Sequence, residues 1–184
     1  MRDLHRQSDA DLVEQARQGS KRALETIVDR YGGSLYSFIR AYVHSNSLAN
    51  ELYQETWLRC FEGLRARYRE QGNFRAWLFG IALNVIRQSR PKPPRSVPLH
   101  ESEDHLLTDP PSSDSELEEA EERRLLYEAI NRLREPEREV VLLRLQSDLT
   151  FREIAEVLRK PLNTVLSHMH RAVRRLRTEL KELA

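Results

Sequence analysis

The region from Thr150 to Leu180 repeats apolar residues with the period of two helices. Thr150 and Glu153 form a predicted capping box at the start of a short helix. That helix should end at Arg159-Lys160-Pro161, because proline cannot continue the helical hydrogen-bond ladder. A longer helix is predicted with Asn163 as its N-cap. Its apolar residues recur at three- and four-residue steps: Val165, Leu166, Met169, Ala172, Val173, Leu176 and Leu180.

The charge of this helix pair indicates a possible role in DNA binding. Residues 150–184 carry eight Lys and Arg against four Asp and Glu. Arg171, Arg174, Arg175 and Arg177 crowd onto the longer helix, as contact with DNA phosphates requires. Two helices, a tight turn and a basic outer side predict a helix-turn-helix whose second helix enters the DNA major groove. An αα-hairpin with a solvated basic face remains the alternative reading of the same pattern.

The first half of the chain shows helical periodicity in four segments and no strand alternation. Ser8 and Asp11 open the first helix, which Gly19 ends. The second helix is predicted over residues 21–43, interrupted only by Gly32-Gly33, and Ser45-Asn46-Ser47 forms a turn. The third is predicted over residues 48–64 and the fourth over residues 74–89. The third should bury Leu52, Trp57, Leu58 and Phe61.

The two halves are separated by a segment of different composition. Residues 90–115 contain six of the eight prolines together with many Ser, Asp and Glu residues, which favours an extended linker. Helical pattern resumes at residues 116–133 and again from Pro136, with Val140, Val141, Leu142 and Leu145 inside. The predicted fold is therefore all-α. It has two small helical domains, residues 1–90 and 117–184, joined by a flexible acidic linker over residues 91–116.

Composition excludes several classes of function. The single cysteine, Cys60, rules out an internal disulfide, and the six histidines do not form a ligand set. There is no glycine-rich phosphate loop, so neither an enzyme nor a bound cofactor, metal or small-molecule substrate is predicted. No apolar run approaches the roughly 20 residues of a membrane span, and the N-terminus lacks a signal-peptide core. A cytoplasmic protein without membrane insertion is expected.

Three local sequences resemble one family in the same order along the chain. LREPEREVVLLR (Leu133–Arg144), with LTFREIAEVL and TVLSHMHRAVRRLR after it, resembles the fourth conserved region of bacterial sigma factors. ELYQETWLR (Glu51–Arg59) is similar to their polymerase-docking segment, and FRAWLFGIALNVIRQ (Phe74–Gln88) to their −10-reading segment. Together with the small size, these motifs resemble an extracytoplasmic-function (ECF) sigma factor of the sigma-70 family. The resemblance implies a region-2-like N-terminal bundle and a region-4-like C-terminal domain.

The resemblance also implies three binding surfaces and two partners, core RNA polymerase and promoter DNA. The polymerase surface would use Glu51, Gln54, Glu55 and Trp57. The −10 element would be bound by Arg65, Arg67, Tyr68, Arg69, Asn73, Phe74, Arg75, Trp77, Asn84, Arg87 and Gln88. The −35 element would be bound by Asn163, Thr164, Ser167, His168, Arg171, Arg174 and Arg175. For Phe74 and Trp77, core packing is the competing interpretation.

Departures from the family pattern suggest regulation. An acidic run common in the docking segment is Leu48-Ala49-Asn50-Glu51 here, so two acidic charges are absent. Phosphorylation of Ser45, Ser47 or Thr56 by a Ser/Thr kinase would restore negative charge, and control by an anti-sigma factor is the other hypothesis. In the −10 helix, Gln88 replaces a common aspartate. In the recognition helix, Leu166 and His168 replace basic residues, which should weaken DNA contact unless His168 is protonated.

Two other functions fit parts of the chain. A sigma mimic would keep the fold but titrate an anti-sigma factor without initiating transcription. The missing acidic pair favours it, whereas the basic cluster on the last helix argues against it. A two-domain repressor would explain the C-terminal half but not ELYQETWLR.

Overall fold

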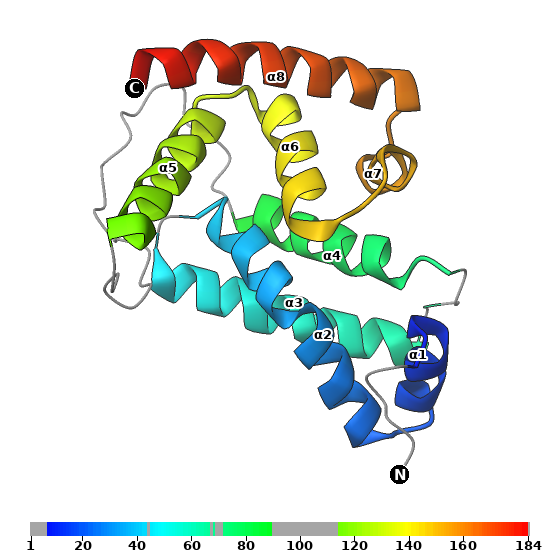
Figure 1. The fold of residues 1–184 in the computed structure, drawn as a ribbon. Coiled ribbons are helices and arrows are strands. Elements are labelled where there is room, and N and C mark those ends of the chain that lie inside the picture. The colour runs from blue at the N-terminus through cyan, green and yellow to red at the C-terminus, as the bar shows by residue number, and fades with distance from the viewer. Residues whose placement is uncertain (1–6, 44, 67, 69–71, 90–113, 184) are drawn as a thin grey trace.

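The computed structural model describes residues 7–43, 45–66, 68, 72–89 and 114–183 (Figure 1). Within these ranges the regular structure consists of eight helices, which confirms the all-α prediction. Their bounds are α1 (Asp9–Arg17), α2 (Lys21–Arg40), α3 (Asn46–Ala66), α4 (Phe74–Ser89), α5 (Asp114–Asn131), α6 (Glu135–Ser147), α7 (Phe151–Leu158) and α8 (Leu162–Leu183). No helix in the described part of the chain has the length and apolar character needed to cross a membrane.

The first two helices begin and continue for local reasons. The Ser8 side chain accepts a hydrogen bond from the Asp11 amide at 3.2 Å and caps α1 as predicted. Helix α2 runs unbroken through Gly32-Gly33. A Cβ at position 32 would lie 2.7 Å from the Tyr53 hydroxyl, so glycine there permits close approach of α3.

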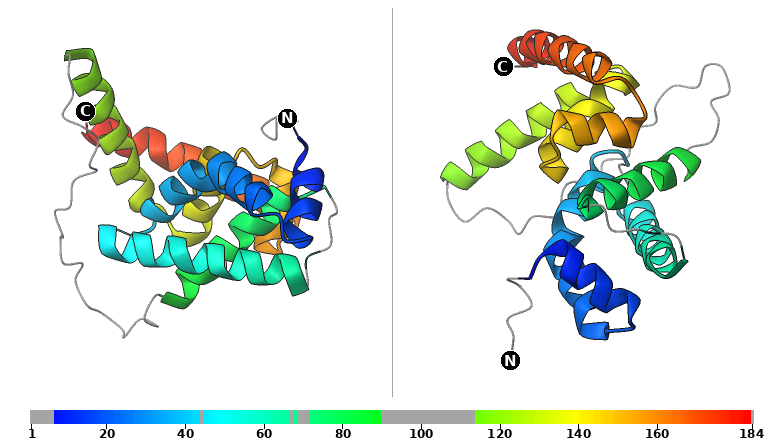
Figure 2. Two further views of the ribbon diagram at one scale, coloured as in Figure 1. Left: turned by 90° about the horizontal axis from the view of Figure 1, so that it is seen from below. Right: turned by 90° about the vertical axis from the view of Figure 1, so that its right-hand side faces the viewer.

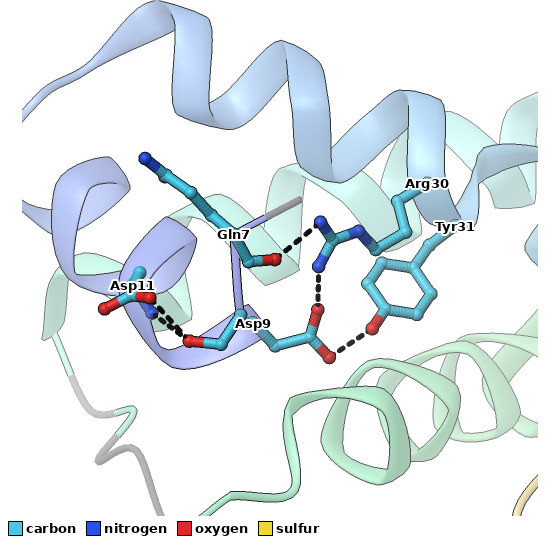
Figure 3. A network of polar contacts seen from close by, with 6 residues as sticks. Gln7, Asp9, Asp11, Arg30 and Tyr31 are labelled. Atoms are coloured by element: carbon cyan, nitrogen blue, oxygen red, sulfur yellow. Dashed lines mark hydrogen bonds and ion pairs between the residues drawn. The ribbon is translucent and has the colours of Figure 1, made fainter. Parts of the chain in front are cut away.

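A polar network fastens the beginning of α1 to α2 (Figure 3). Arg30 donates to Asp9 Oδ1 at 2.5 Å and to the Gln7 carbonyl at 2.8 Å. The Tyr31 hydroxyl donates to the other Asp9 oxygen. Burial, with the Asp9 hydrogen bond second, raises the pKa of Tyr31 to about 12, so this phenol stays protonated and keeps its donor.

Helix α3 starts two residues earlier than its pattern predicted. Asn46 and Ser47 belong to the helix, while Ser45 precedes it and accepts a hydrogen bond from the Leu48 amide at 3.3 Å. Near the other end, a Cβ at Gly63 would lie 2.7 Å from the Trp77 ring. Glycine there allows α4 to pack directly on α3.

The helix-turn-helix forms as predicted, with one correction at its turn. Thr150 and Glu153 make the capping box of α7. Arg159, with a φ of 52°, ends that helix in the left-handed conformation. Helix α8 begins at Leu162, and the Pro161 carbonyl accepts hydrogen bonds from the amides of Thr164 and Val165. Asn163 is therefore inside the helix, and its prediction as an N-cap was wrong.

The helices of the two halves pack against each other. Helix α8 lies along one side of the molecule, with α5, α6 and α7 between it and the N-terminal helices (Figures 1 and 2). Helix α4 contacts α6 and α7, and α2 contacts α6. Buried apolar side chains from both halves form one continuous cluster. Residues 91–113 of the predicted linker lie outside the described residues. Helix α5 starts at Asp114, so it includes the last three residues of the predicted linker.

Candidate nucleic-acid and polymerase interfaces

Helix α8 brings the predicted −35 side chains together on one element. Val165 and Ala172 are fully buried and fix which side of α8 faces the core. The predicted side chains lie on the remaining surface. Asn163, Ser167, Arg171 and Arg174 are exposed, and Thr164, His168 and Arg175 are half-buried. The helix is thus anchored along one side and presents polar and basic groups on the other.

A buried carboxylate that the sequence pattern did not reveal faces this basic surface. The Glu137 side chain, on the first turn of α6, is only 4% exposed. Its oxygens lie 3.5 Å from Arg171 Nε and 3.0 Å from Arg175 Nη1. The second contact is an ion pair without hydrogen-bond geometry. From sequence, Glu137 is an ordinary acidic residue at a helix N-terminus.

His168 completes a short chain of polar contacts on α8. Arg171 Nη2 lies 2.7 Å from His168 Nδ1. Burial, followed by the charges of Lys160 and Arg171, lowers the pKa of His168. Protonation of His168 is therefore disfavoured in this structure. The sequence pattern had required a protonated His168 to make up for the missing basic residues at this DNA surface.

A hollow of about 430 Å³ opens beside the same arginines. It lies between α8 and the segment that follows α5. Its lining is Arg132, Leu133, Arg171, Arg174, Arg175, Thr178 and Glu179. Four guanidinium groups around one hollow favour an anionic ligand such as a DNA phosphate.

The aromatic side chains predicted to capture −10 bases lie in the core. Tyr68 and Phe74 are buried, with ring centroids 5.9 Å apart. Trp77 is half-buried, 4.4 Å from the Tyr68 ring. In this structure these rings pack against one another and do not form an exposed stacking surface. Core packing is the correct interpretation for Phe74. Tyr68 was predicted to bind the −10 element, and its burial in the core corrects that prediction.

The polar −10 candidates contact the other half of the protein. Arg87 donates through Nε and Nη2 to Glu139 Oε1 at 2.9 and 2.6 Å, and the Glu139 side chain is 4% exposed. Asn73 donates to Glu156 at 3.0 Å, and Arg75 reaches the Ser147 carbonyl at 3.5 Å. These three contacts, here named the interdomain contacts, join α4 and the residue before it to α6 and α7.

The remaining −10 candidates are at the surface or outside the described residues. Arg65, Asn84 and Gln88 are exposed. Arg67 and Arg69 lie outside the described residues. Gln88 accepts a hydrogen bond from Arg59 at 2.6 Å, and Arg59 also pairs with Glu55 at 2.6 Å. Arg59, which no site prediction included, therefore connects the predicted polymerase and −10 surfaces.

The polymerase surface on α3 differs from its prediction at two neighbouring positions. Glu51 and Gln54 are exposed, and Glu55 is half-buried. Trp57 is buried and stacks on Phe61 at 5.5 Å, so it supports the helix from inside. Leu58, predicted to be core, is 58% exposed. Positions 51, 54, 55 and 58 follow the i, i+3, i+4, i+7 spacing of one helix face, a signal that could have identified Leu58.

One of the three phosphorylation candidates is incompatible with the structure. Thr56 is fully buried, and its hydroxyl donates to the Leu52 carbonyl at 2.7 Å. A kinase cannot reach it while α3 is packed. Ser45 and Ser47 are exposed at the start of α3. Among the described residues there is also no cluster of His, Cys, Asp or Glu side chains that could hold a metal.

Comparison with known proteins connects both halves to one family. Residues 27–92 match the family model for sigma-70 region 2, and residues 123–176 match the model for sigma-70, region 4. The ECF RNA polymerase sigma-E factor of Haemophilus influenzae is 26% identical over 185 residues, covering 96% of this chain and 97% of that protein. The RNA polymerase sigma-H factor of Pseudomonas aeruginosa is 29% identical over 178 residues, covering 92% of each.

Solved structures show the same fold. CnrH in complex with the cytosolic domain of CnrY matches with a TM-score of 0.72 and 23% identity, over 99% of this chain and 100% of that chain. The sigma factor RpoE of Bartonella quintana, in complex with the anti-sigma factor NepR, matches with a TM-score of 0.60 and 21% identity, over 85% and 96%. With both conserved regions present in order on an all-helical fold, the chain belongs to the ECF sigma factors of the sigma-70 family.

Proposed function

We propose that this protein binds core RNA polymerase in the cytoplasm and directs it to promoters whose −10 and −35 elements it recognises. The observation that carries the proposal is the α8 surface. It presents a row of polar and basic side chains on an exposed face, beside a hollow lined by arginines. Major-groove reading needs such a face, and phosphate contact needs the neighbouring cations.

The polymerase surface comprises Glu51, Gln54, Glu55 and Leu58 on α3. The two carboxylates suit a basic partner surface. Leu58 adds an apolar contact that becomes buried on association and supplies affinity without charge. This combination compensates in part for the absence of acidic residues in the first turn of α3.

The −10 surface is engaged within the free protein. Asn73, Arg75 and Arg87 make the interdomain contacts, so their polar groups are occupied. We infer that polymerase binding separates the two halves and releases these side chains for the melted promoter strand. In the closed form the Glu139 carboxylate neutralises the charge of Arg87, which opposes binding of nucleic acid there.

Runoff transcription with purified core polymerase tests the function. The unmodified protein should give a defined transcript from promoters of its own genome. Leu58→Ala should reduce holoenzyme formation. Arg174→Ala, remote from α3, should leave holoenzyme formation intact and weaken promoter binding with a smaller salt dependence. Core binding without a transcript from any of these promoters would contradict the proposal and favour the sigma mimic.

Control by a partner protein or a kinase is a narrower proposal. The solved structures of CnrH and RpoE are complexes with CnrY and the anti-sigma factor NepR, which favours an anti-sigma partner here. The kinase hypothesis is restricted to Ser45 and Ser47. If α3 docks only after phosphorylation, Ser47→Glu should raise affinity for core polymerase, and equal affinity of both proteins would refute it.

A further inference from the structure

The hydrogen bond between Arg171 and His168 constrains the protonation of the histidine. Arg171 Nη2 lies 2.7 Å from His168 Nδ1, one helical turn away on α8. A guanidinium group has only donors and remains charged in proteins. Nδ1 must therefore be the acceptor and carry no proton. A neutral imidazole has a single N–H, so the proton is on Nε2.

The charges around His168 favour its neutral form. Burial lowers the pKa of His168 most, and the charges of Lys160, before α8, and Arg171, on α8, lower it further. Glu137 and Glu139 on α6 act in the opposite direction with smaller effect. The lowered pKa favours the neutral imidazole at pH 7, and the Arg171 hydrogen bond is compatible with that state.

Arg171 is itself held from a second helix. Its Nε lies 3.5 Å from Glu137 Oε1, while a different nitrogen of the same guanidinium group, Nη2, contacts His168. The Glu137 carboxylate is buried and also faces Arg175. Because α6 fixes Glu137, the ion pair restricts rotation of the Arg171 guanidinium group before any ligand binds. The hydrogen bond from Arg171 in turn restricts the orientation of the His168 ring.

The other ring nitrogen of His168 is the one available to a ligand. Among the described residues, no group forms a hydrogen bond with Nε2. Nε2 is also absent from the set of fully buried polar atoms without a partner, so it is not sealed off from solvent. A ligand at this surface therefore meets an N–H donor. In the major groove, guanine presents two acceptors, adenine N7 and thymine O4 present one each, and cytosine presents an amino donor.

We propose that Arg171 locks His168 as an Nε2–H donor, and that His168 consequently selects a base with a major-groove acceptor and rejects cytosine at one position of the −35 element. Guanine is preferred because it presents two acceptors. Arg171 is the positioning residue and His168 reads the base. The opposite tautomer would accept at Nε2 and reverse the preference. The base-reading half of this proposal rests on the promoter-binding function proposed above.

The tautomer can be measured without DNA. Two-bond ¹H–¹⁵N correlation spectra of the full-length labelled protein at pH 7.5 should show the Nε2–H form of His168. Arg171→Ala should lower the fraction of the Nε2–H form and raise the pKa of His168. Arg174→Ala removes the same charge from the same helix without contacting His168, so it should change neither. A dominant Nδ1–H form, or an Arg171→Ala spectrum identical to wild type, would overturn the proposal.

Base selection is measured with holoenzyme and promoter duplexes randomised over the −35 region, with a constant −10 element. Wild-type protein should deplete cytosine at one position by about tenfold. His168→Ala should lose discrimination at that position alone. An unchanged preference in His168→Ala would overturn base reading by His168 and leave the proposed function intact. Failure of wild-type holoenzyme to select any −35 sequence would instead contradict promoter recognition itself.

Discussion

At the scale of single residues, exposure separates apolar side chains that pack from those available to a partner. Leu58, Leu145, Leu166 and Val173 fit helical apolar patterns, yet all four are exposed. Helical period gives the direction of a side chain but not how far the neighbouring helices extend over it. For Leu58 the discrepancy is informative, since its exposed neighbours are the predicted polymerase contacts.

Replacing glycine with alanine should change the stability of the protein in opposite directions at two positions inside helices. Gly63→Ala places a methyl group 2.7 Å from the Trp77 ring, so α3 and α4 must separate. We expect a loss of about 1–3 kcal/mol in the free energy of unfolding. Gly33→Ala meets nothing within 4 Å and should gain about 0.5–1 kcal/mol through helix propensity. Urea denaturation measures both, and equal effects of the two substitutions would contradict the packing.

Cys60 should be chemically inert in the folded protein. Burial raises the pKa of its thiol well above the ordinary range of a cysteine, to about 12. At pH 8 the thiolate fraction is then about a thousandfold lower than for an unperturbed thiol. Iodoacetamide should modify Cys60 slowly in native protein and rapidly in guanidinium chloride. Equal rates in both conditions would show that the thiol is accessible.

The raised thiol pKa also has a consequence for stability. The unfolded chain loses the thiol proton at a lower pH than the folded one, so this contribution to stability is complete below about pH 9 and declines as pH rises toward 12.

At the scale of helices, local signals predicted most of the architecture. Ser8, Pro136 and the Thr150–Glu153 capping box act within a few residues of their own backbone, so sequence alone placed α1, α6 and α7. The start of α8 was misplaced because the Pro161 carbonyl, not the Asn163 side chain, accepts the first amides. The partners of Asn73 and Arg87 lie 83 and 52 residues away, and no local pattern identifies them.

The pair between Arg87 and Glu139 should hold the two halves together. Glu139→Gln removes the charge from a buried acceptor of two hydrogen bonds, while Arg87 remains 40% exposed to solvent. We expect the closed arrangement to lose about 1–2 kcal/mol. Small-angle X-ray scattering should then show a larger radius of gyration. Glu121→Gln disrupts an exposed pair within α5 and should leave the radius unchanged.

At the scale of the whole molecule, the two elements proposed to read DNA are in different states. Helix α8 presents its polar face to solvent, whereas α4 and Asn73 are engaged with α6 and α7. The family resemblance indicated both elements as DNA-binding candidates, and that assignment stays a prediction. It could not reveal this asymmetry, because the contacts that occupy α4 depend on how the two halves pack. Under the proposed function, the free protein is therefore prepared for the −35 element and closed to the −10 element.

The most direct test is the distance between spin labels placed at Glu25 on α2 and Lys181 on α8, both exposed and outside the predicted binding surfaces. Double electron–electron resonance should give one narrow distance distribution for the free protein. Addition of core polymerase and promoter should replace it with a different distribution, and Glu139→Gln should populate part of that change without any partner. The same distribution in the free and promoter-bound states would contradict the account, because the interdomain contacts could not then be exchanged for DNA.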